Sequence, residues 1–447
     1  MQYAKVTRTI AGRQLSLETG RIAKQAAGAV MGRLGDSMVL ATVCRADPRP
    51  GLDFFPLSVE YREKTYAAGK FPGGFIKREG RPKDKEILTC RLIDRPIRPL
   101  WPEAYKDEIQ IMCTVVSADT ENDPGLVAMN AAFAAVYAST LPFMGPIAAV
   151  RIGRIDGEFI AFPTIDQVNE GDLDLTVVGS RDALVMVEGQ AGEIPEDEFI
   201  AALEFAGGTL GELLDMMEEL RREAQVPDVT WTAPEVHIPE VYHEVQRECR
   251  DAMQRAIVVT GKHERYAALD ELKRGVMDRW VDEGAPDADE RKRWAKQALK
   301  DLETELIRSM ILDQGRRIDG RGLEDIRPIN VDAGLLPRTH GSAVFTRGET
   351  QALVVTTLGT PRDQQIVDGL QEEYSKRFDL HYNFPPYCVG EVKPMRGVSR
   401  REIGHGTLAE RALASMIPAE EKFPYTIRLV SEVTESNGSS SMATVCG

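Results

Sequence analysis

The fold is decided by a stretch that occurs twice in the chain: residues 35–43 read GDSMVLATV, and residues 348–357 read GETQALVVTT. In both copies a glycine-containing turn leads into an apolar, β-branched run, which predicts a buried strand that follows a tight turn. The two copies lie about 314 residues apart, and a long internal repeat of this kind indicates one structural unit present twice.

Two further pairs of segments repeat at nearly the same offset. Residues 94–102 (DRPIRPLWP) match residues 410–418 (ERALASMIP), since each begins with an acid-arginine pair and has a proline seven residues after the arginine. Residues 116–121 (VSADTE) match residues 430–435 (VSEVTE). Three anchors in the same order predict a duplicated α/β unit; chance similarity between amphipathic segments is the alternative.

The segments between the two copies have a helical composition. Ala, Leu, Glu, Lys and Arg dominate residues 196–223, 242–284 and 289–312. An apolar residue recurs every four positions in the last segment, at Trp294, Ala298, Leu302 and Leu306. Such a stripe favours packing between helices over a binding groove. The expected linkers contain Pro227, Pro234 and Pro239 before the helices and residues 315–320 (GRRIDG) after them.

The composition is that of a soluble globular protein. Of 447 residues, 43% are hydrophobic and 28% charged, and no apolar run reaches the length of a membrane helix. The first residues lack an apolar signal segment and the six cysteines form no CxxC pair, so we expect a cytoplasmic protein without a membrane contact or a zinc site. A net charge of −15 repels polyanions, so any nucleic-acid contact is expected in local basic patches.

Basic residues concentrate in one region of the first copy. Residues 71–82 (FPGGFIKREGRP) begin this region, and from Lys77 to Arg98 there are eight Lys or Arg against four Asp or Glu. An exposed ring that stacks on a base, beside cations that follow the phosphates, makes a clamp for single-stranded nucleic acid. A solvated loop followed by a helix with i, i+4 ion pairs fits the same pattern. The candidate nucleic-acid-binding residues are Phe75, Lys77, Arg78, Arg91, Arg95 and Arg98.

In the second copy, residues 435–445 (ESNGSSSMATV) have the pattern of an anion site. A Gly-Ser-Ser-Ser turn before an apolar helix offers hydroxyl groups and unbonded backbone N–H groups, which suits a phosphate. A plain serine N-cap is the alternative. We align residues 438–441 (GSSS) with residues 124–127 (PGLV) of the first copy, so that no hydroxyl stands opposite Ser439, Ser440 or Ser441. We infer that the second copy keeps a phosphate site that the first has lost.

A basic segment, residues 400–406 (RREIGHG), comes before this turn. Arg400 and Arg401 suit forked recognition of phosphate oxygens. His405 lies one helical turn after Arg401, and a role as acid or base competes with a structural role as a hydrogen-bond donor. Arg400, Arg401 and His405 are therefore the candidate catalytic residues.

These motifs resemble those of the polynucleotide phosphorylase family. The resemblance rests on residues 75–78 (FIKR), 91–100 (RLIDRPIRPL), 400–406 (RREIGHG) and 434–441 (TESNGSSS), and it extends over essentially the whole chain. It implies an α/β (α+β) fold of two duplicated RNase PH-like units (ribosomal protein S5 domain 2-like) with an all-α domain between them. The expected domains are residues 1–228, 229–312 and 313–447, the last of them incomplete.

The resemblance also implies an activity. Family members shorten single-stranded RNA from its 3′ end by attack of inorganic phosphate, release nucleoside diphosphates, and run the reaction in reverse. They form homotrimers around an RNA channel and can join an endoribonuclease-based degradosome. Phe75, Lys77 and Arg78 would grip the RNA, with Ile76 where the family often has a second ring. A non-catalytic ring subunit that only channels RNA is the alternative.

The family's cofactor is Mg²⁺ or Mn²⁺, held by aspartates of a GDMDFK motif downstream of the serines. The sequence ends at Gly447, before such a motif, so we expect a truncated chain without the metal ligands and without the family's C-terminal RNA-binding modules. Residues 171–176 (GDLDLT) resemble the motif, with Thr176 in place of its lysine. Exposed acids on an alternating strand are the favoured interpretation of Asp172 and Asp174.

Overall fold

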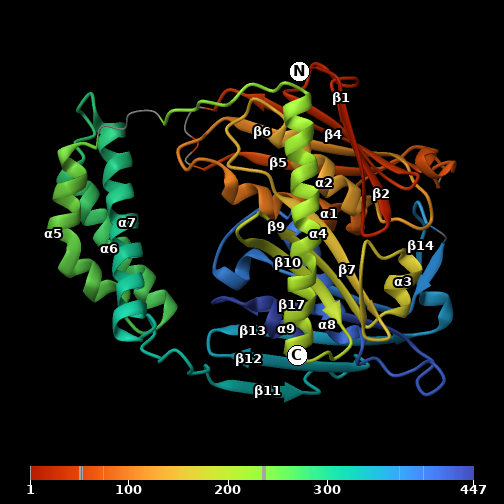
Figure 1. Cartoon of the computed structure of the whole chain (residues 1–447). Helices are drawn as coiled ribbons and strands as arrows, with labels where there is room; N and C mark the ends of the chain where they lie inside the picture. The colour runs from red at the N-terminus through yellow and green to blue at the C-terminus, as the bar shows by residue number, and fades with distance from the viewer. Residues whose placement is uncertain are drawn as a thin grey trace.

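The structure, a computed structural model, describes residues 2–49, 52, 54–73, 75–233, 238–371, 373–395 and 397–447. Figure 1 shows a helical bundle beside a larger body that contains two units built on β-sheets. Pro234 of the expected linker lies outside the described residues. None of the helices in the described part of the chain is long and apolar enough to cross a membrane.

The first sheet has the strand order β1-β2-β3-β4-β6-β5, antiparallel except for the pair β5 and β6. Its strands are β1 (Ala4–Ile10), β2 (Arg13–Thr19), β3 (Gly28–Leu34), β4 (Ser37–Ala46), β5 (Leu57–Glu63) and β6 (Glu108–Ser117). Between β5 and β6 come η1 (Thr65–Ala68), α1 (Asp84–Ile97) and η2 (Arg98–Leu100). Residues 35–43, which decide the fold, form the turn into β4 and most of that strand, whose inward residues Val39, Ala41 and Val43 are fully buried.

A second sheet completes the first unit. Its order is β10-β9-β7-β8, with β7 (Ala148–Ile155), β8 (Glu158–Ala161), β9 (Leu173–Gly179) and β10 (Leu184–Ala191). Helix α2 (Pro124–Tyr137) contacts β3 and β4 of the first sheet and β7 of the second, which explains why it is apolar on every side. The short α3 (Ile165–Glu170) and the long α4 (Glu196–Glu223) follow, and α4 packs across strands of both sheets.

Helices α5 (Glu240–Ile257), α6 (Lys262–Trp280) and α7 (Ala288–Gln314) form the bundle drawn at the left of Figure 1. The predicted stripe on α7 packs inward: Ala298 and Leu302 are fully buried, and Trp294 and Leu306 pack against the same cluster. Residues 242–284, for which the composition predicts helical structure, contain most of α5 and all of α6, and the helical conformation is interrupted between Ile257 and Lys262. Gly261, with φ of +89°, stands immediately before α6 and adopts a backbone conformation that favours glycine.

The second unit contains the sheet β11-β12-β13-β17-β16. Its strands are β11 (Ile329–Ala333), β12 (Gly341–Arg347), β13 (Thr350–Gly359), β16 (Phe378–Asn383) and β17 (Thr426–Glu435). The remaining elements are η3 (Pro361–Asp363), the hairpin of β14 (Gln365–Val367) and β15 (Tyr374–Lys376), η4 (Pro386–Val389), α8 (Arg400–Ala414) and α9 (Ser440–Cys446).

The structure confirms the duplication. The order β2-β3-β4-β6-β5 of the first unit corresponds to β11-β12-β13-β17-β16 of the second, and in each unit the last pair is parallel. Each long antiparallel pair also carries an irregularity at the same place, between Met38 and Val39 in one unit and between Gln351 and Ala352 in the other. Helices α1 and α8 correspond as predicted: their equivalent arginines, Arg95 and Arg411, both pair with Glu188.

The third sequence anchor is wrong in register. Tyr61 of β5 pairs with Cys113 of β6, and the equivalent Tyr382 of β16 pairs with Ser431 of β17. The two strands therefore superpose with an offset four residues larger than the match of residues 116–121 to 430–435 implies. A slip by four leaves the same residues on the buried face of a strand, so the similarity in pattern does not reveal the error.

Candidate functional site

A pocket with about 670 Å³ of empty space lies in the second unit. It is lined by Phe384, Val389, Glu391, Lys393, Arg401, His405, Ser436, Gly438, Ser439, Ser440 and Ser441. The pocket brings part of the predicted site together. Arg401 and His405 come from helix α8, and Ser439, Ser440 and Ser441 come from the N-cap and first turn of α9.

The serine turn has a specific backbone shape. Gly438 and Ser439 both have positive φ, +89° and +52°, and Ser439 is the N-cap of α9. Thr350 fixes the turn from β13, because its hydroxyl donates to Gly438 O at 3.1 Å and accepts from Asn437 N at 3.0 Å. The first amides of α9 have no carbonyl partner within the helix. The turn therefore presents N–H groups and hydroxyls together.

Ser440, which lines the pocket, contacts the buried Tyr382 of β16. Ser440 is 3% exposed, and its hydroxyl lies 2.6 Å from the Tyr382 hydroxyl, so one donates to the other. Burial raises the pKa of Tyr382, which keeps its phenol protonated and available as a donor. Tyr382 was missed in the sequence, where nothing distinguishes it from a core aromatic residue.

Arg401 and His405 form one wall. The guanidinium of Arg401 lies 5.1 Å from the ring centre of Phe384, and the described residues give Arg401 no carboxylate partner within ion-pair distance. Nδ1 of His405 is buried and has no hydrogen-bond partner among the described residues. A cation with no carboxylate to neutralise it, next to an unsatisfied ring nitrogen, is an arrangement that an anion with a protonated oxygen would complete.

His405 is held in its neutral form. Burial lowers its pKa, and the charges of Arg401 and Arg91 lower it further. A neutral imidazole has one N–H donor and one acceptor nitrogen. His405 can therefore either donate to a phosphate oxygen or accept a proton from one at neutral pH.

Arg400 does not lie in the pocket, contrary to its pairing with Arg401 in the sequence prediction. It donates to Val59 O at 2.7 Å and forms an ion pair with Glu60, both on β5 of the first unit. Successive residues on a helix point about 100° apart, so only one of two adjacent arginines can face the pocket. Arg400 joins the two units instead.

Two neighbouring elements support the serine turn. Lys262, at the start of α6 in the helical bundle, donates through Nζ to Ser436 O at 2.6 Å and through its backbone N to Glu349 at 2.9 Å. Glu349 also accepts from Asn437 Nδ2 at 2.7 Å. The bundle therefore contacts the site directly through its second helix.

The predicted nucleic-acid loop is exposed. Phe71, Phe75 and Ile76 are 88%, 101% and 83% exposed, and Lys77 and Arg78 also face solvent. Gly74 of this loop lies outside the described residues. An aromatic ring with no protein contacts gains by stacking on a base. The RNA-binding role of Phe75, Lys77 and Arg78 stays a prediction.

The three candidate arginines of α1 and η2, Arg91, Arg95 and Arg98, have other surroundings. Arg95 pairs with Glu188 at 2.8 Å, and Arg98 bonds to Asp94 at 2.7 Å and to Leu57 O at 3.0 Å. Arg91 packs on α8 of the second unit, since a Cβ on Gly404 would lie 2.6 Å from its Nε. Their predicted part in RNA binding is untested, and the contacts of Arg95 and Arg98 are those of structural residues.

The described residues include no group of three or more His, Cys, Asp or Glu that could hold a metal ion. In the GDLDLT segment, Asp174 forms two hydrogen bonds with Arg151, at 2.6 and 2.8 Å, and Asp172 bonds to Arg154 at 3.2 Å. Strand β9 alternates between buried and partly exposed residues over its first half, but only Asp172, which precedes the strand, has an exposed side chain, whereas that of Asp174 is 20% exposed. The residues present do not form a Mg²⁺ site, and we assign none of them to a cation.

Family models match both sheet-containing units and the helical bundle between them. Residues 11–142 and 325–447 match domain 1 of the 3′ exoribonuclease family, and residues 145–208 match its domain 2. Residues 240–322, which contain the helical bundle, match the polyribonucleotide nucleotidyltransferase RNA binding domain. The two matches to domain 1 correspond to the two sheets that share a strand order.

Curated relatives are similar over nearly the whole chain. Polyribonucleotide nucleotidyltransferases of Sorangium cellulosum, Rhodospirillum centenum and Thermotoga neapolitana are each 51% identical over 98% of this chain. The chain spans 58%, 61% and 62% of their respective lengths. The crystal structure of rice (Oryza sativa) Rrp46 is 17% identical, has a TM-score of 0.38, and covers 46% of this chain and 94% of that one, a similarity too low to add to the assignment.

The predicted fold class and the predicted resemblance to polynucleotide phosphorylase, the polyribonucleotide nucleotidyltransferase of the relatives' names, are both confirmed. Two RNase PH-like sheets carry the matches, and a helical segment lies between them. Because the matches to domain 1 alone cover more than half of its residues, the chain belongs to the 3′ exoribonuclease family.

Proposed function

We propose that this protein is a phosphorolytic 3′-to-5′ exoribonuclease, a polyribonucleotide nucleotidyltransferase that degrades single-stranded RNA to nucleoside diphosphates. The observation that carries the proposal is the pocket in which Arg401, the buried unpartnered Nδ1 of His405 and the hydroxyls of Ser439 to Ser441 converge. Inorganic phosphate fits this set of donors in charge and in hydrogen bonding.

The proposed reaction joins two anions. A phosphate oxygen attacks the phosphorus of the last phosphodiester of RNA, and the bond to the 3′ oxygen of the preceding nucleotide breaks. The terminal nucleotide leaves as a diphosphate, and the shortened RNA keeps a 3′ hydroxyl. Because both reactants are negatively charged, the protein's main contributions are positioning and charge neutralisation. Arg401 supplies a positive charge, and the serine turn supplies donors that hold the phosphate for attack.

The neutral state of His405 suits this step. Monohydrogen phosphate carries one proton, and the attacking oxygen must be free of it. The 3′ oxygen that leaves must gain a proton, and the proton of the phosphate balances the reaction. The unpartnered nitrogen of His405 can accept that proton from the phosphate, or fix the phosphate by donating to it. The family resemblance adds a divalent cation, Mg²⁺ or Mn²⁺, as a requirement of the reaction; the described residues do not indicate where it binds.

We further propose a division of labour between the units. The exposed loop with Phe75, Lys77 and Arg78 grips single-stranded RNA, and the second unit binds phosphate. The matches to relatives named polyribonucleotide nucleotidyltransferase, and to the RNA binding domain of that enzyme, support RNA as the substrate.

The proposed assembly is a cytoplasmic homotrimer around an RNA channel, which can dock on an endoribonuclease-based degradosome. One structural feature supports self-association: β11 is an edge strand with every residue exposed, including Ile329 at 57% and Val331 at 54%. Edge strands with exposed apolar side chains are usually covered. Sedimentation velocity should give a trimer, and Ile329→Lys should shift it toward the monomer.

The test of the function is a degradation assay on 5′-labelled single-stranded RNA with Mg²⁺, in the presence and absence of phosphate. The proposal predicts phosphate-dependent shortening from the 3′ end, with nucleoside diphosphates as products, and polymerisation when diphosphates are supplied in excess. Degradation without phosphate would refute phosphorolysis. RNA binding without any degradation, in conditions where a relative is active, would favour the non-catalytic ring subunit.

A further inference from the structure

The duplication allows residues of the two units to be compared one by one. Glu86 and Glu402 play the same part: each accepts from the backbone N of its helix N-cap and from a backbone N at the end of the neighbouring strand, Glu63 N and Phe384 N respectively. Counting from this shared contact, Lys85 stands in the first unit where Arg401 stands in the second.

The helix N-caps give a second point of correspondence. Ser439 is the N-cap of α9, and Asp123 is the N-cap of the equivalent helix α2. The sequence alignment of residues 438–441 with residues 124–127 places Ser439 opposite Gly125, and is therefore wrong by two residues at this point. The first unit does not simply lack the hydroxyls, because it carries a carboxylate at the position of the first serine.

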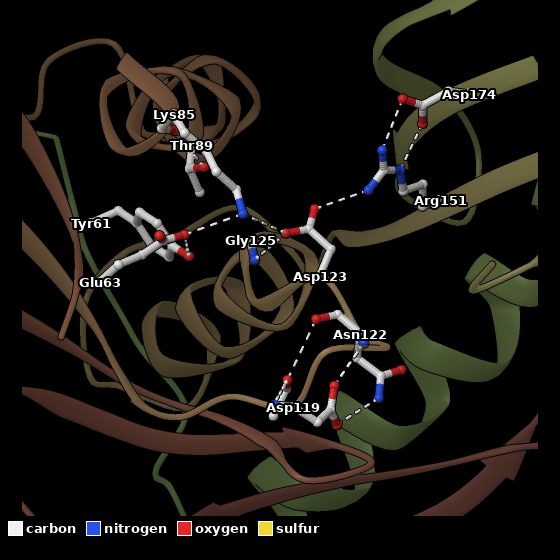
Figure 2. Close-up of polar contacts among 11 residues, drawn as sticks. Tyr61, Glu63, Lys85, Thr89, Asp119, Asn122, Asp123, Gly125, Arg151 and Asp174 are labelled. Atoms are coloured by element: carbon white, nitrogen blue, oxygen red, sulfur yellow. Dashed lines mark hydrogen bonds and ion pairs between the residues drawn. The ribbon is translucent and has the colours of Figure 1, made fainter. Parts of the chain in front are cut away.

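The contacts of that carboxylate are those expected of a bound phosphate. Oδ1 of Asp123 accepts from Gly125 N at 3.0 Å and lies 3.7 Å from Nζ of Lys85. Oδ2 accepts from Arg151 at 3.1 Å. A first-turn amide and two cations thus surround one anionic group (Figure 2).

Gly125 leaves room for this carboxylate. It stands where the second unit has Ser441, and a Cβ at Gly125 would lie 3.3 Å from Asp123 Oδ1 and 3.4 Å from Oδ2. Contacts this short require the carboxylate to move. The absence of a side chain at Gly125 therefore allows the carboxylate to keep this position without a shift of a few tenths of an ångström.

The remaining neighbours of Asp123 also differ from those of the serine turn in the second unit. Glu63, in place of Phe384, pairs with Lys85 at 3.3 Å and accepts from the Tyr61 hydroxyl at 3.0 Å. Asp174 neutralises the second cation, Arg151 (Figure 2). Burial opposes ionisation of Asp123, but Lys85 and Arg151 outweigh it and lower the pKa of this carboxyl, so it stays charged at neutral pH.

We propose that the Asp123 carboxylate is a built-in anion that occupies, in the first unit, the position that inorganic phosphate takes in the second. The proposal rests on the phosphate site of the proposed function. It assigns the loss of phosphate binding in the first unit to one side chain that competes for the same donors. The site is latent, and removal of the carboxylate should open it to a tetrahedral oxyanion.

The test is the number of phosphates bound per chain. Equilibrium dialysis with radiolabelled inorganic phosphate should give one phosphate per chain for the unmodified protein and two for Asp123→Ser, which copies Ser439. Adding Glu63→Phe, which copies Phe384, should tighten the second site because one competing acid is removed. Asp172→Ser is the matched control, since Asp172 is an acid of the first unit that also pairs with an arginine, Arg154, and it should leave the number at one.

The outcomes separate the two proposals. One phosphate per chain in both the unmodified protein and a folded Asp123→Ser would overturn the built-in anion while sparing the second-unit site. No phosphate in the unmodified protein and one in Asp123→Ser would support the built-in anion and count against the proposed function.

A second variant covers the case in which Asp123→Ser does not fold. Asp123→Gly removes the whole side chain and leaves a residue that is tolerated as a helix N-cap. Phosphate or sulfate should then raise the unfolding midpoint of Asp123→Gly more than that of the unmodified protein or of Asp172→Gly, because the anion replaces the lost charge. Equal shifts in all three proteins would refute the proposal.

Discussion

Replacing Arg401 by methionine should weaken phosphate binding and leave the fold intact. The guanidinium faces the pocket, and its one protein contact of note is with the ring of Phe384, which methionine can partly replace. A hydrogen bond to a charged group contributes about 1.5–3 kcal/mol. Since about 1.4 kcal/mol corresponds to a tenfold change, the half-saturating phosphate concentration should rise about 10- to 150-fold.

Arg400→Met is the matched control, because it removes the same group from the preceding residue. Arg400 bonds to Val59 O and Glu60 of the first unit and lies outside the pocket. This variant should lower the unfolding midpoint and leave the phosphate requirement within about twofold, whereas Arg401→Met should do the opposite. Phosphate titrations of the degradation rate, with thermal unfolding of the same samples, give both readouts. Equal effects of the two substitutions on the phosphate requirement would refute the assignment.

Three further predictions concern the loop, the serines and the histidine. Phe75→Ala should weaken binding of single-stranded RNA by about 1–3 kcal/mol in fluorescence anisotropy without changing thermal unfolding, because the ring is fully exposed; unchanged affinity would remove the clamp. Ser439→Ala with Ser440→Ala should raise the phosphate requirement and leave RNA affinity largely intact, and an equal loss of both would contradict the site. The pKa of His405 is lower in the folded protein than in the unfolded chain, so the unfolded chain binds a proton first as pH falls below about 6.5. The contribution of neutral His405 to the free energy of unfolding is therefore complete above that pH and is lost as pH drops further. His405→Gln should reduce this loss in urea unfolding at pH 7.5 and 5.5, and an unchanged pH dependence would show that His405 is not its source.

The duplicated fold could be predicted because its signals are local. The turn and apolar run at residues 35–43 and 348–357 predict the same strand twice, and the structure has β4 and β13 there. The register between β6 and β17 could not be predicted from the sequence. Side chains on a strand alternate with a period of two, so a shift by four residues preserves the pattern of buried and exposed positions. The irregularity between Gln351 and Ala352 gives no clear sequence signal.

The candidate site was predictable in its chemistry and less so in its geometry. Ser439 to Ser441 and Arg401 were found from their residue types, and they do share a pocket. Arg400 could not be separated from Arg401, since the difference depends on which face of α8 packs against the first unit. Phe384 and Lys393 line the pocket from segments whose composition suggests nothing about a site.

Asp123 illustrates a different limit. An aspartate before a helix is a common N-cap, and Asp123 is one, with its side chain accepting from Gly125 N. The proposed role of Asp123 as a built-in anion follows only from its structural equivalence with Ser439 and from its ion pairs with Lys85 and Arg151. That equivalence depends on a loop whose length differs between the units, which a sequence alignment of the repeats misplaces.

The central claim is that inorganic phosphate, bound in the second unit, is the nucleophile that shortens RNA. The most direct measurement follows labelled inorganic phosphate through the reaction with unlabelled single-stranded RNA and Mg²⁺. The account predicts that the label appears as the β-phosphate of the released nucleoside diphosphates, at one label per nucleotide released, and that Arg401→Met reduces this incorporation at low phosphate. Release of unlabelled nucleoside monophosphates, with water as the source of the new oxygen, would contradict it.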